Sequence, residues 1–154
     1  IVLPAPGLGV TLSAAELVVR NFCVGEALSI PILRGSWHAT KQPLIRAVLA
    51  RIVKDEAAHG AFGWIFLDWV DDQLSDDDRL HLSKQAALTM DAVIDRWPFI
   101  PVFEDETPED RLGWMDAKTY FDVARRSLRK VVLEPLLKHG LDPRPWMKRS
   151  IEAS

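Results

Sequence analysis

The feature that most constrains the fold is a stretch at about residues 43–73, whose apolar side chains repeat with the period of an α-helix. They fall on one side of the predicted helix: Ile45, Val48, Leu49, Ile52, Gly63, Phe66, Leu67 and Val70. Glu56 and His59 lie on the same stripe, so the sequence predicts a buried carboxylate and a buried imidazole one helical turn apart. Burial of both groups is unfavourable without a partner, and a metal ion can bind two side chains at this spacing.

The remaining chain also shows helical patterns, and strand signals are nearly absent. Besides the stretch at 43–73, helices are predicted at about residues 13–37, 76–96, 108–114 and 116–139. The turn between the first two predicted helices is short, so these helices should pack antiparallel. The sequence therefore predicts an all-α fold.

Local signals set the expected helix ends and irregularities. Ser13 and Glu16 have the spacing of a capping box, which predicts that the first helix begins there. Gly25 and Pro31 predict a kink or bulge at about 25–31, because glycine is a weak helix former and proline lacks a backbone donor. Ser75, which three aspartates follow, is predicted to cap the helix at about 76–96.

The length of 154 residues is sufficient for one domain with a hydrophobic core. We expect residues 1–12 to be a linker, because prolines and glycines are frequent there, and residues 13–154 to be a single helical domain. Within this domain, 13–73 is the helix pair with the metal motif and 76–154 contains the C-terminal helices. The linker is typical of a connection between helix pairs, which favours a further pair upstream of it.

Charge and cysteine content exclude several classes of protein. The net charge of −3 indicates no basic surface for nucleic acid or an anionic membrane. The longest apolar runs are too short to span a bilayer, so no membrane partner is expected. Cys23 is the only cysteine, which excludes an internal disulfide and favours a reducing, cytoplasmic location. Its apolar neighbours predict a small core residue rather than a reactive thiol.

A second acidic residue, Glu26, lies on the apolar side of the first predicted helix. Glu26 lies about 12 residues before the turn and Glu56 about 13 residues after Pro43, so both are roughly 18–20 Å from the turn at about 1.5 Å per residue. Because the two helices are antiparallel, Glu26, Glu56 and His59 should lie at the same level and converge. We therefore predict that these three side chains are metal ligands.

A purely structural interpretation remains open, in which Glu56 and His59 form a buried hydrogen-bonded pair inside a helical core. A two-metal centre would need a second set of ligands. Asp78 and His81 have the closest spacing, but they fall in the first turn after an acidic cap. His38 and His139 lie at helix ends, where capping or surface positions are expected.

The stretch from Asn21 to Trp69 resembles the second half of the ferritin-like superfamily, through the segments NFCVGEALSIPIL and RAVLARIVKDEAAHGAFGWIFLDW. It is most similar to bacterial ferritin-like domain-containing proteins, in which a Gly-Glu-Thr or Gly-Glu-Ala helix precedes an Asp-Glu-x-x-His helix. The resemblance implies a ferritin-like helical bundle and a carboxylate-bridged di-iron or di-manganese centre, with Glu26, Glu56 and His59 as ligands. That family has an upstream helix pair with a further Glu and Glu-x-x-His, so this sequence carries half of the ligand set.

Two functions follow as hypotheses. The first is an oxidoreductase that uses iron or manganese to activate dioxygen and oxidise an unknown small molecule. The second is a non-catalytic helical binding or assembly module that retains the ferritin-like fold. The missing ligands would come from an N-terminal helix pair of a longer parent protein, which we favour, or from a second copy in a two-fold symmetric homodimer. Iron storage is a weaker hypothesis, because nothing indicates a cage.

Overall fold

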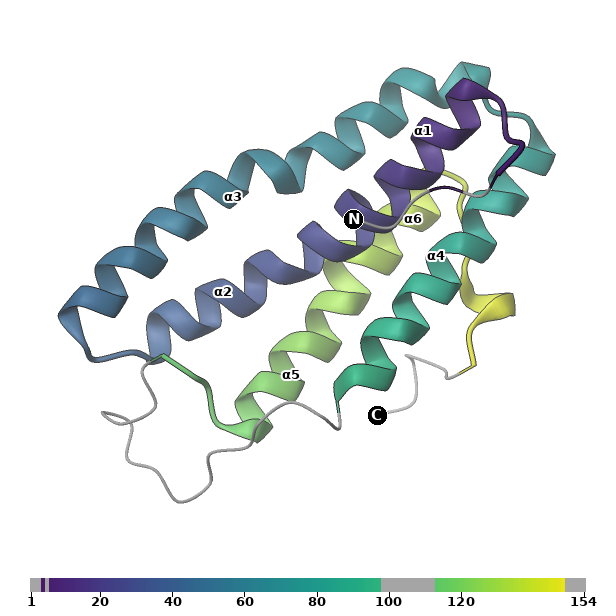
Figure 1. Ribbon diagram of the computed structural model, residues 1–154. Helices are drawn as coiled ribbons and strands as arrows, with labels where there is room; N and C mark the ends of the chain where they lie inside the picture. The colour runs from purple at the N-terminus through teal and green to yellow at the C-terminus, as the bar shows by residue number, and fades with distance from the viewer. Residues whose placement is uncertain (1–3, 5, 98–112, 149–154) are drawn as a thin grey trace.

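The computed structural model describes residues 4, 6–97 and 113–148, except for the side chain of Ala57 (Figure 1). Within these ranges the secondary structure is helical, without a strand, which confirms the all-α prediction. The predicted helix at 108–114 lies outside the described residues apart from Gly113 and Trp114, which are not helical. None of the described helices combines the length and apolar character needed to cross a membrane.

The first helical run is continuous and consists of α1 (Val10–Val18), the π-helical segment η1 (Val19–Glu26) and α2 (Ala27–Ala39). After a short turn, α3 (Pro43–Val70) returns antiparallel along this run and ends in the 3₁₀ turn η2 (Asp71–Gln73). The first run therefore forms the central layer, and α3 covers one side of it.

The other side of the first run is covered by the C-terminal half of the chain. It comprises α4 (Asp76–Arg96), α5 (Ala117–Ser127), the π-helical segment η4 (Leu128–Leu133), α6 (Glu134–Lys138) and the 3₁₀ turn η5 (Arg144–Trp146). The core lies between these elements and the first run, and its largest fully buried apolar residues include Val19, Val24, Leu82, Met90, Leu128, Val132 and Leu136. Cys23 is fully buried among them, as predicted, and burial raises the pKa of its thiol.

Two helix starts show where local signals were sufficient and where they were not. Ser75 caps α4 as predicted: its Oγ accepts from the Asp78 backbone N at 3.2 Å, and Asp78 Oδ2 accepts from the Ser75 backbone N at 3.0 Å. The predicted capping box at Ser13 is wrong. The helix already begins at Val10, inside the predicted linker, and the Ser13 hydroxyl instead donates to the Leu8 carbonyl at 3.4 Å.

The predicted irregularity of the first helix is present, but it lies mostly before the expected position. The backbone widens into π-helical turns over Val19–Glu26 and then continues as regular α-helix through Pro31. Pro31 lies inside α2, where it lacks the backbone N–H that would otherwise donate to the Ala27 carbonyl. The π-helical segment ends at Glu26, so the distortion involves a predicted metal ligand directly.

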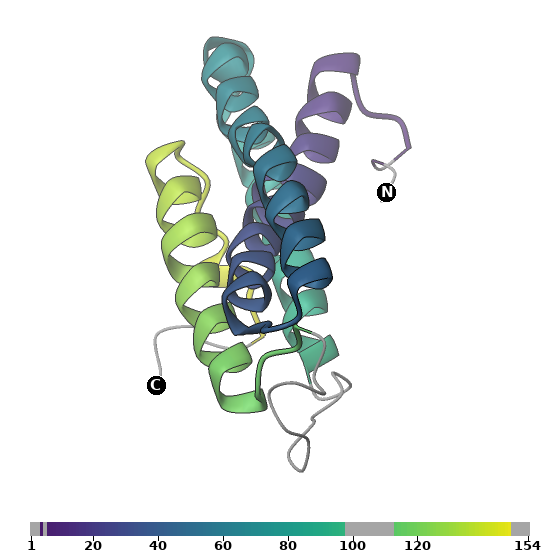
Figure 2. The same cartoon turned by 90° about the vertical axis from the view of Figure 1, so that its left-hand side faces the viewer.

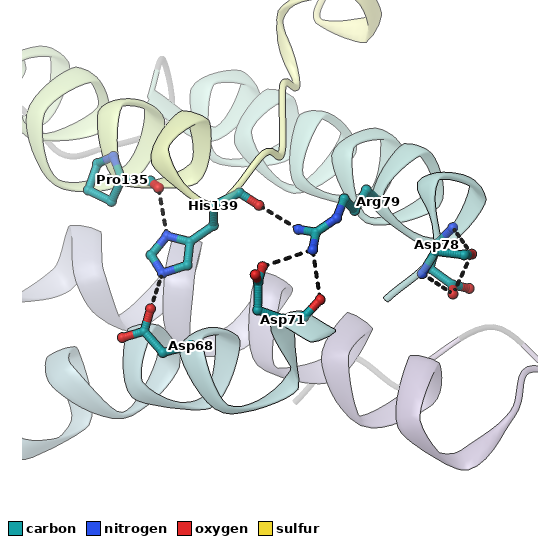
Figure 3. Close-up of polar contacts among 7 residues, drawn as sticks. Asp68, Asp71, Asp78, Arg79, Pro135 and His139 are labelled. Atoms are coloured by element: carbon teal, nitrogen blue, oxygen red, sulfur yellow. Dashed lines mark hydrogen bonds and ion pairs between the residues drawn. The ribbon is translucent and has the colours of Figure 1, made fainter. Parts of the chain in front are cut away.

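A cluster of polar contacts joins the C-terminal end of α3 to α4 and α6 (Figure 3). His139, at the end of α6, has both ring nitrogens engaged, one by the Pro135 carbonyl at 2.9 Å and the other by Asp68 Oδ1 at 3.1 Å. Arg79 on α4 donates to the His139 carbonyl at 2.9 Å and to the Asp71 carbonyl and Oδ1 at 2.8 Å. His139 is therefore a helix-end residue, as predicted, and is occupied by structural contacts.

Candidate metal centre

Glu26, Glu56 and His59 converge, as the sequence predicted. Each offers one donor atom, and these atoms all lie within 4.8 Å of one another. Glu26 is the last residue of η1, whereas Glu56 and His59 lie in the middle of α3. The three side chains therefore bring donors from two helices to one place, as a metal site requires.

The spacing of Glu56 and His59 is compatible with binding to one ion. His59 Nδ1 and Glu56 Oε2 are 2.9 Å apart. Two donors that each bind a first-row divalent ion at about 2.1 Å and at right angles are about 3.0 Å apart. The same 2.9 Å separation is that of a hydrogen bond, so the pair alone also fits the structural interpretation. The position of Glu26 beside the pair is what distinguishes the two interpretations.

The group contains more acidic than basic side chains. It contains two carboxylates and one imidazole, and within the described ranges no lysine or arginine pairs with Glu26 or Glu56. The Ser29 hydroxyl, at 3.5 Å from Glu26 Oε2, supplies a long neutral hydrogen bond. Carboxylates at this separation repel each other, and a bound divalent cation would remove the repulsion.

The predicted burial of the motif is wrong. The side chain of His59 is 56% exposed and that of Glu56 is 24% exposed. The apolar residues Val48 and Ile52, which were expected on the buried stripe, are also exposed. The cause is that α3 packs mainly on the first helical run, so only a narrow side of it, which includes Val53 and Leu67, is covered.

The uncovered side of α3 forms an apolar surface around His59, which we call the α3 outer face. Its exposed large side chains are Leu44, Val48, Ile52, Phe62, Ile65 and Trp69. In Figure 2, where α3 faces the viewer, no other described element lies over it. These apolar residues share this side of α3 with the exposed Arg51–Asp55 ion pair. Exposed apolar side chains that gather on one side of a helix are typical of a contact with another protein segment.

A buried acidic residue that the sequence interpretation missed lies at Glu16 on α1. Glu16 is fully buried, and its Oε1 accepts from Arg20 Nη1 at 2.9 Å while its Oε2 accepts from His81 Nε2 at 2.8 Å. The spacing of Glu16 and Arg20, four residues apart, was a visible signal for this pair. The contact with His81 on α4 had no local signal, because the two residues are 65 positions apart.

The other histidines and Asp78 do not join the predicted ligands. His81 is held by Glu16, and Asp78 is held by the Ser75 cap, so this motif does not act as a second ligand pair. His38 is exposed at the end of α2 and lies against the Trp37 ring, with centroids 4.7 Å apart. Among the described residues, Glu26, Glu56 and His59 are thus the one group with metal-ligand geometry.

A cavity of about 420 Å³ lies at the C-terminal end of α2, away from this group. Its lining residues are Gly35, His38, Ala39, Trp114, Met115, Asp116 and Thr119. None of the three predicted ligands lines it, so this cavity does not present a small molecule to them.

No protein-family model matches the chain, and neither a curated protein nor a solved structure shows significant similarity to it. The functional interpretation therefore depends on the residues and their geometry.

Proposed function

We propose that the chain is a metal-binding protein of the ferritin-like class, in which Glu26, Glu56 and His59 hold iron or manganese. The observation that carries the proposal is the convergence of their donors within 4.8 Å from two helices. Mixed carboxylate and imidazole donors suit these metals. The π-helical segment that ends at Glu26 adds support, since π-helical turns are frequent at functional sites.

The proposed activity is that of an oxidoreductase acting on an unknown small molecule with dioxygen as oxidant. Iron or manganese, when bound, would supply the redox chemistry of dioxygen. The chain's own contribution would be to hold the ion: Glu26 and Glu56 would balance its charge, and His59 would bind it through a ring nitrogen. A cytoplasmic location is proposed with it, because the free thiol of Cys23 is kept in the core.

Completion of a two-metal centre would require ligands beyond these three. The exposed position of His59 within the α3 outer face leaves room for them on that side. We propose that a covering helix pair supplies them, either from a longer parent protein or from a second copy of the chain.

A second candidate function is favoured by the same surface. The α3 outer face would serve a non-catalytic binding or assembly module equally well, because burial of its apolar residues requires no metal. In that case the convergence of Glu26, Glu56 and His59 would have no role in the contact.

Metal loading of the purified chain separates the two functions. We expect anaerobically added Fe²⁺ to bind and to give an absorption band on exposure to oxygen, and the band to disappear in Glu56→Ala and His59→Ala. His38→Ala is the matched control, because His38 is an exposed histidine outside the group. A well-folded protein that binds no metal, or binding that survives both substitutions, would contradict the proposed metal centre.

A further inference from the structure

The helix α3 approaches the first helical run closely at Gly63. A Cβ atom at Gly63 would lie 2.8 Å from Cys23 Sγ, 3.1 Å from the Cys23 backbone N and 3.1 Å from Phe22 Cβ. Ordinary contacts of this kind are 3.4–4 Å. The backbone N and Phe22 Cβ cannot move away by a side-chain rotation, so a larger residue would have to separate α3 from η1.

This contact lies one helical turn from the predicted ligands on both helices. Gly63 follows His59 by one turn of α3, and Cys23 precedes Glu26 by about one turn of η1. Any widening at Gly63 therefore increases the separation between Glu26 and the pair on α3. A productive metal site holds its ligands within about 0.5 Å of the binding geometry, and relief of the 3.1 Å contacts at Gly63 takes up a few tenths of an ångström of this range.

Gly60, one turn nearer to the motif, has a different environment. A Cβ atom there would meet Cδ1 of Ile30, and the next atom, Ile30 Cγ1, is 3.9 Å away. Cδ1 is the end of a flexible side chain, which can rotate without moving the backbone. The two glycines of α3 therefore differ in what an added methyl group would displace.

We propose that Gly63 is a positioning residue of the metal centre. Its missing side chain allows α3 to approach the π-helical segment closely enough for Glu26, Glu56 and His59 to reach one ion. The inference rests on the proposed function, because it assigns to Gly63 the spacing of ligands that are themselves proposed.

The test compares Gly63→Ala with Gly60→Ala in the full chain. Both substitutions exchange glycine for alanine in the same helix, so both raise helix propensity equally. Binding of Mn²⁺ alone is measured by loss of the free-ion signal in electron paramagnetic resonance, with circular dichroism to verify folding. We expect Gly63→Ala to raise the Kd for Mn²⁺ at least about tenfold and Gly60→Ala to change it less than about threefold. Equal affinities of the two variants would overturn the inference.

If Gly63→Ala does not fold, the comparison is made between Cys23→Ala and the double variant Cys23→Ala/Gly63→Ala. The double variant lacks the sulfur, while the contacts with the Cys23 backbone N and Phe22 Cβ remain. We expect the double variant to bind Mn²⁺ at least about tenfold more weakly than Cys23→Ala. Equal binding would again overturn the inference.

A measurement without metal separates this inference from the proposed function. The wild-type chain should show a strong nuclear Overhauser effect between the Cys23 amide hydrogen and the Gly63 α-hydrogens, and its absence would overturn the close approach. A wild-type chain that shows this effect but does not bind Mn²⁺ would overturn the proposed function and leave Gly63 as a packing residue alone.

Discussion

Of the carboxylate–imidazole pairs among the described residues, two have nearly equal distances and very different surroundings. Glu16 and His81 are 2.8 Å apart and join α1 to α4, whereas Glu56 and His59 are 2.9 Å apart within α3. Glu16 is fully buried and also receives a hydrogen bond from Arg20. The first pair is thus balanced by the chain itself, and distance alone does not distinguish it from the second.

The Glu56–His59 pair has the opposite environment. The pair is partly exposed to solvent. The third candidate ligand beside it, Glu26, is a second carboxylate. A partly exposed group of two carboxylates and one imidazole contributes little to folding and is suited to binding a cation. The comparison therefore teaches that charge balance and exposure, rather than hydrogen-bond length, separate a structural pair from a candidate ligand pair.

The largest expected effect is on folding stability. Glu16→Ala should lower the free energy of unfolding by about 2–3 kcal/mol, because it leaves Arg20 and His81 partly buried without their shared acceptor. Glu56→Ala should change it by less than about 0.5 kcal/mol in metal-free protein. Urea unfolding measures both, with Glu16→Gln as the variant of matched shape. A Glu56→Ala loss as large as that of Glu16→Ala would favour the purely structural interpretation of Glu56 and His59.

The second prediction concerns metal-induced stabilisation. At a free metal concentration about 100 times the Kd, Fe²⁺ or Mn²⁺ should raise the free energy of unfolding by about 2.7 kcal/mol, because only the folded chain brings the three donors together. The increment should vanish in His59→Ala and persist in Glu16→Gln, whatever the stability of the apo variant. Thermal or urea unfolding with and without metal, under anaerobic conditions for Fe²⁺, gives the increment. Its persistence in His59→Ala would assign the binding to other residues.

The candidate site could be predicted from the sequence because its geometry is local. The spacing of Glu56 and His59 is fixed by one helix, and the level of Glu26 follows from two antiparallel helices joined by a short turn. Its exposure could not be predicted in the same way. Which side of α3 is covered depends on the elements that pack against it, and an apolar stripe such as Val48 and Ile52 does not reveal whether a covering element is present.

The fold shows the same division between local and distant information. The cap at Ser75 and the extent of α4 agreed with prediction, because the hydroxyl and the carboxylate of Asp78 act within one turn. The capping box at Ser13 failed because α1 begins earlier, at Val10, so Ser13 lies inside the helix and not at its N-cap. Glu16 instead accepts hydrogen bonds from Arg20 and His81.

The smallest expected effect is on the pH dependence of stability. It concerns Asp78, whose carboxylate accepts hydrogen bonds from Ser75 three residues earlier. Hydrogen bonds from Ser75 lower the pKa of Asp78 below its usual value of 3.8. Because the pKa of Asp78 is lower in the folded chain than in the unfolded chain, the ionised carboxylate stabilises the fold. This stabilisation is complete at a pH above the unfolded-state pKa and is lost as the pH falls through the folded-state pKa. Ser75→Ala should therefore cost about 1 kcal/mol at pH 6, and the difference from wild type should shrink below about pH 3.8.

Urea unfolding of both proteins across this pH range measures the contribution of the cap. Because Asp78 belongs to the motif that imitates a second ligand pair, Mn²⁺ binding is measured in the same variant. Unchanged binding in Ser75→Ala is expected, since the cap holds Asp78 at the start of α4 and His81 is held by Glu16. Weakened binding would show that the first turn of α4 affects the metal centre. The distinction between Glu16–His81 as a structural pair and Glu26, Glu56 and His59 as metal ligands would then no longer hold.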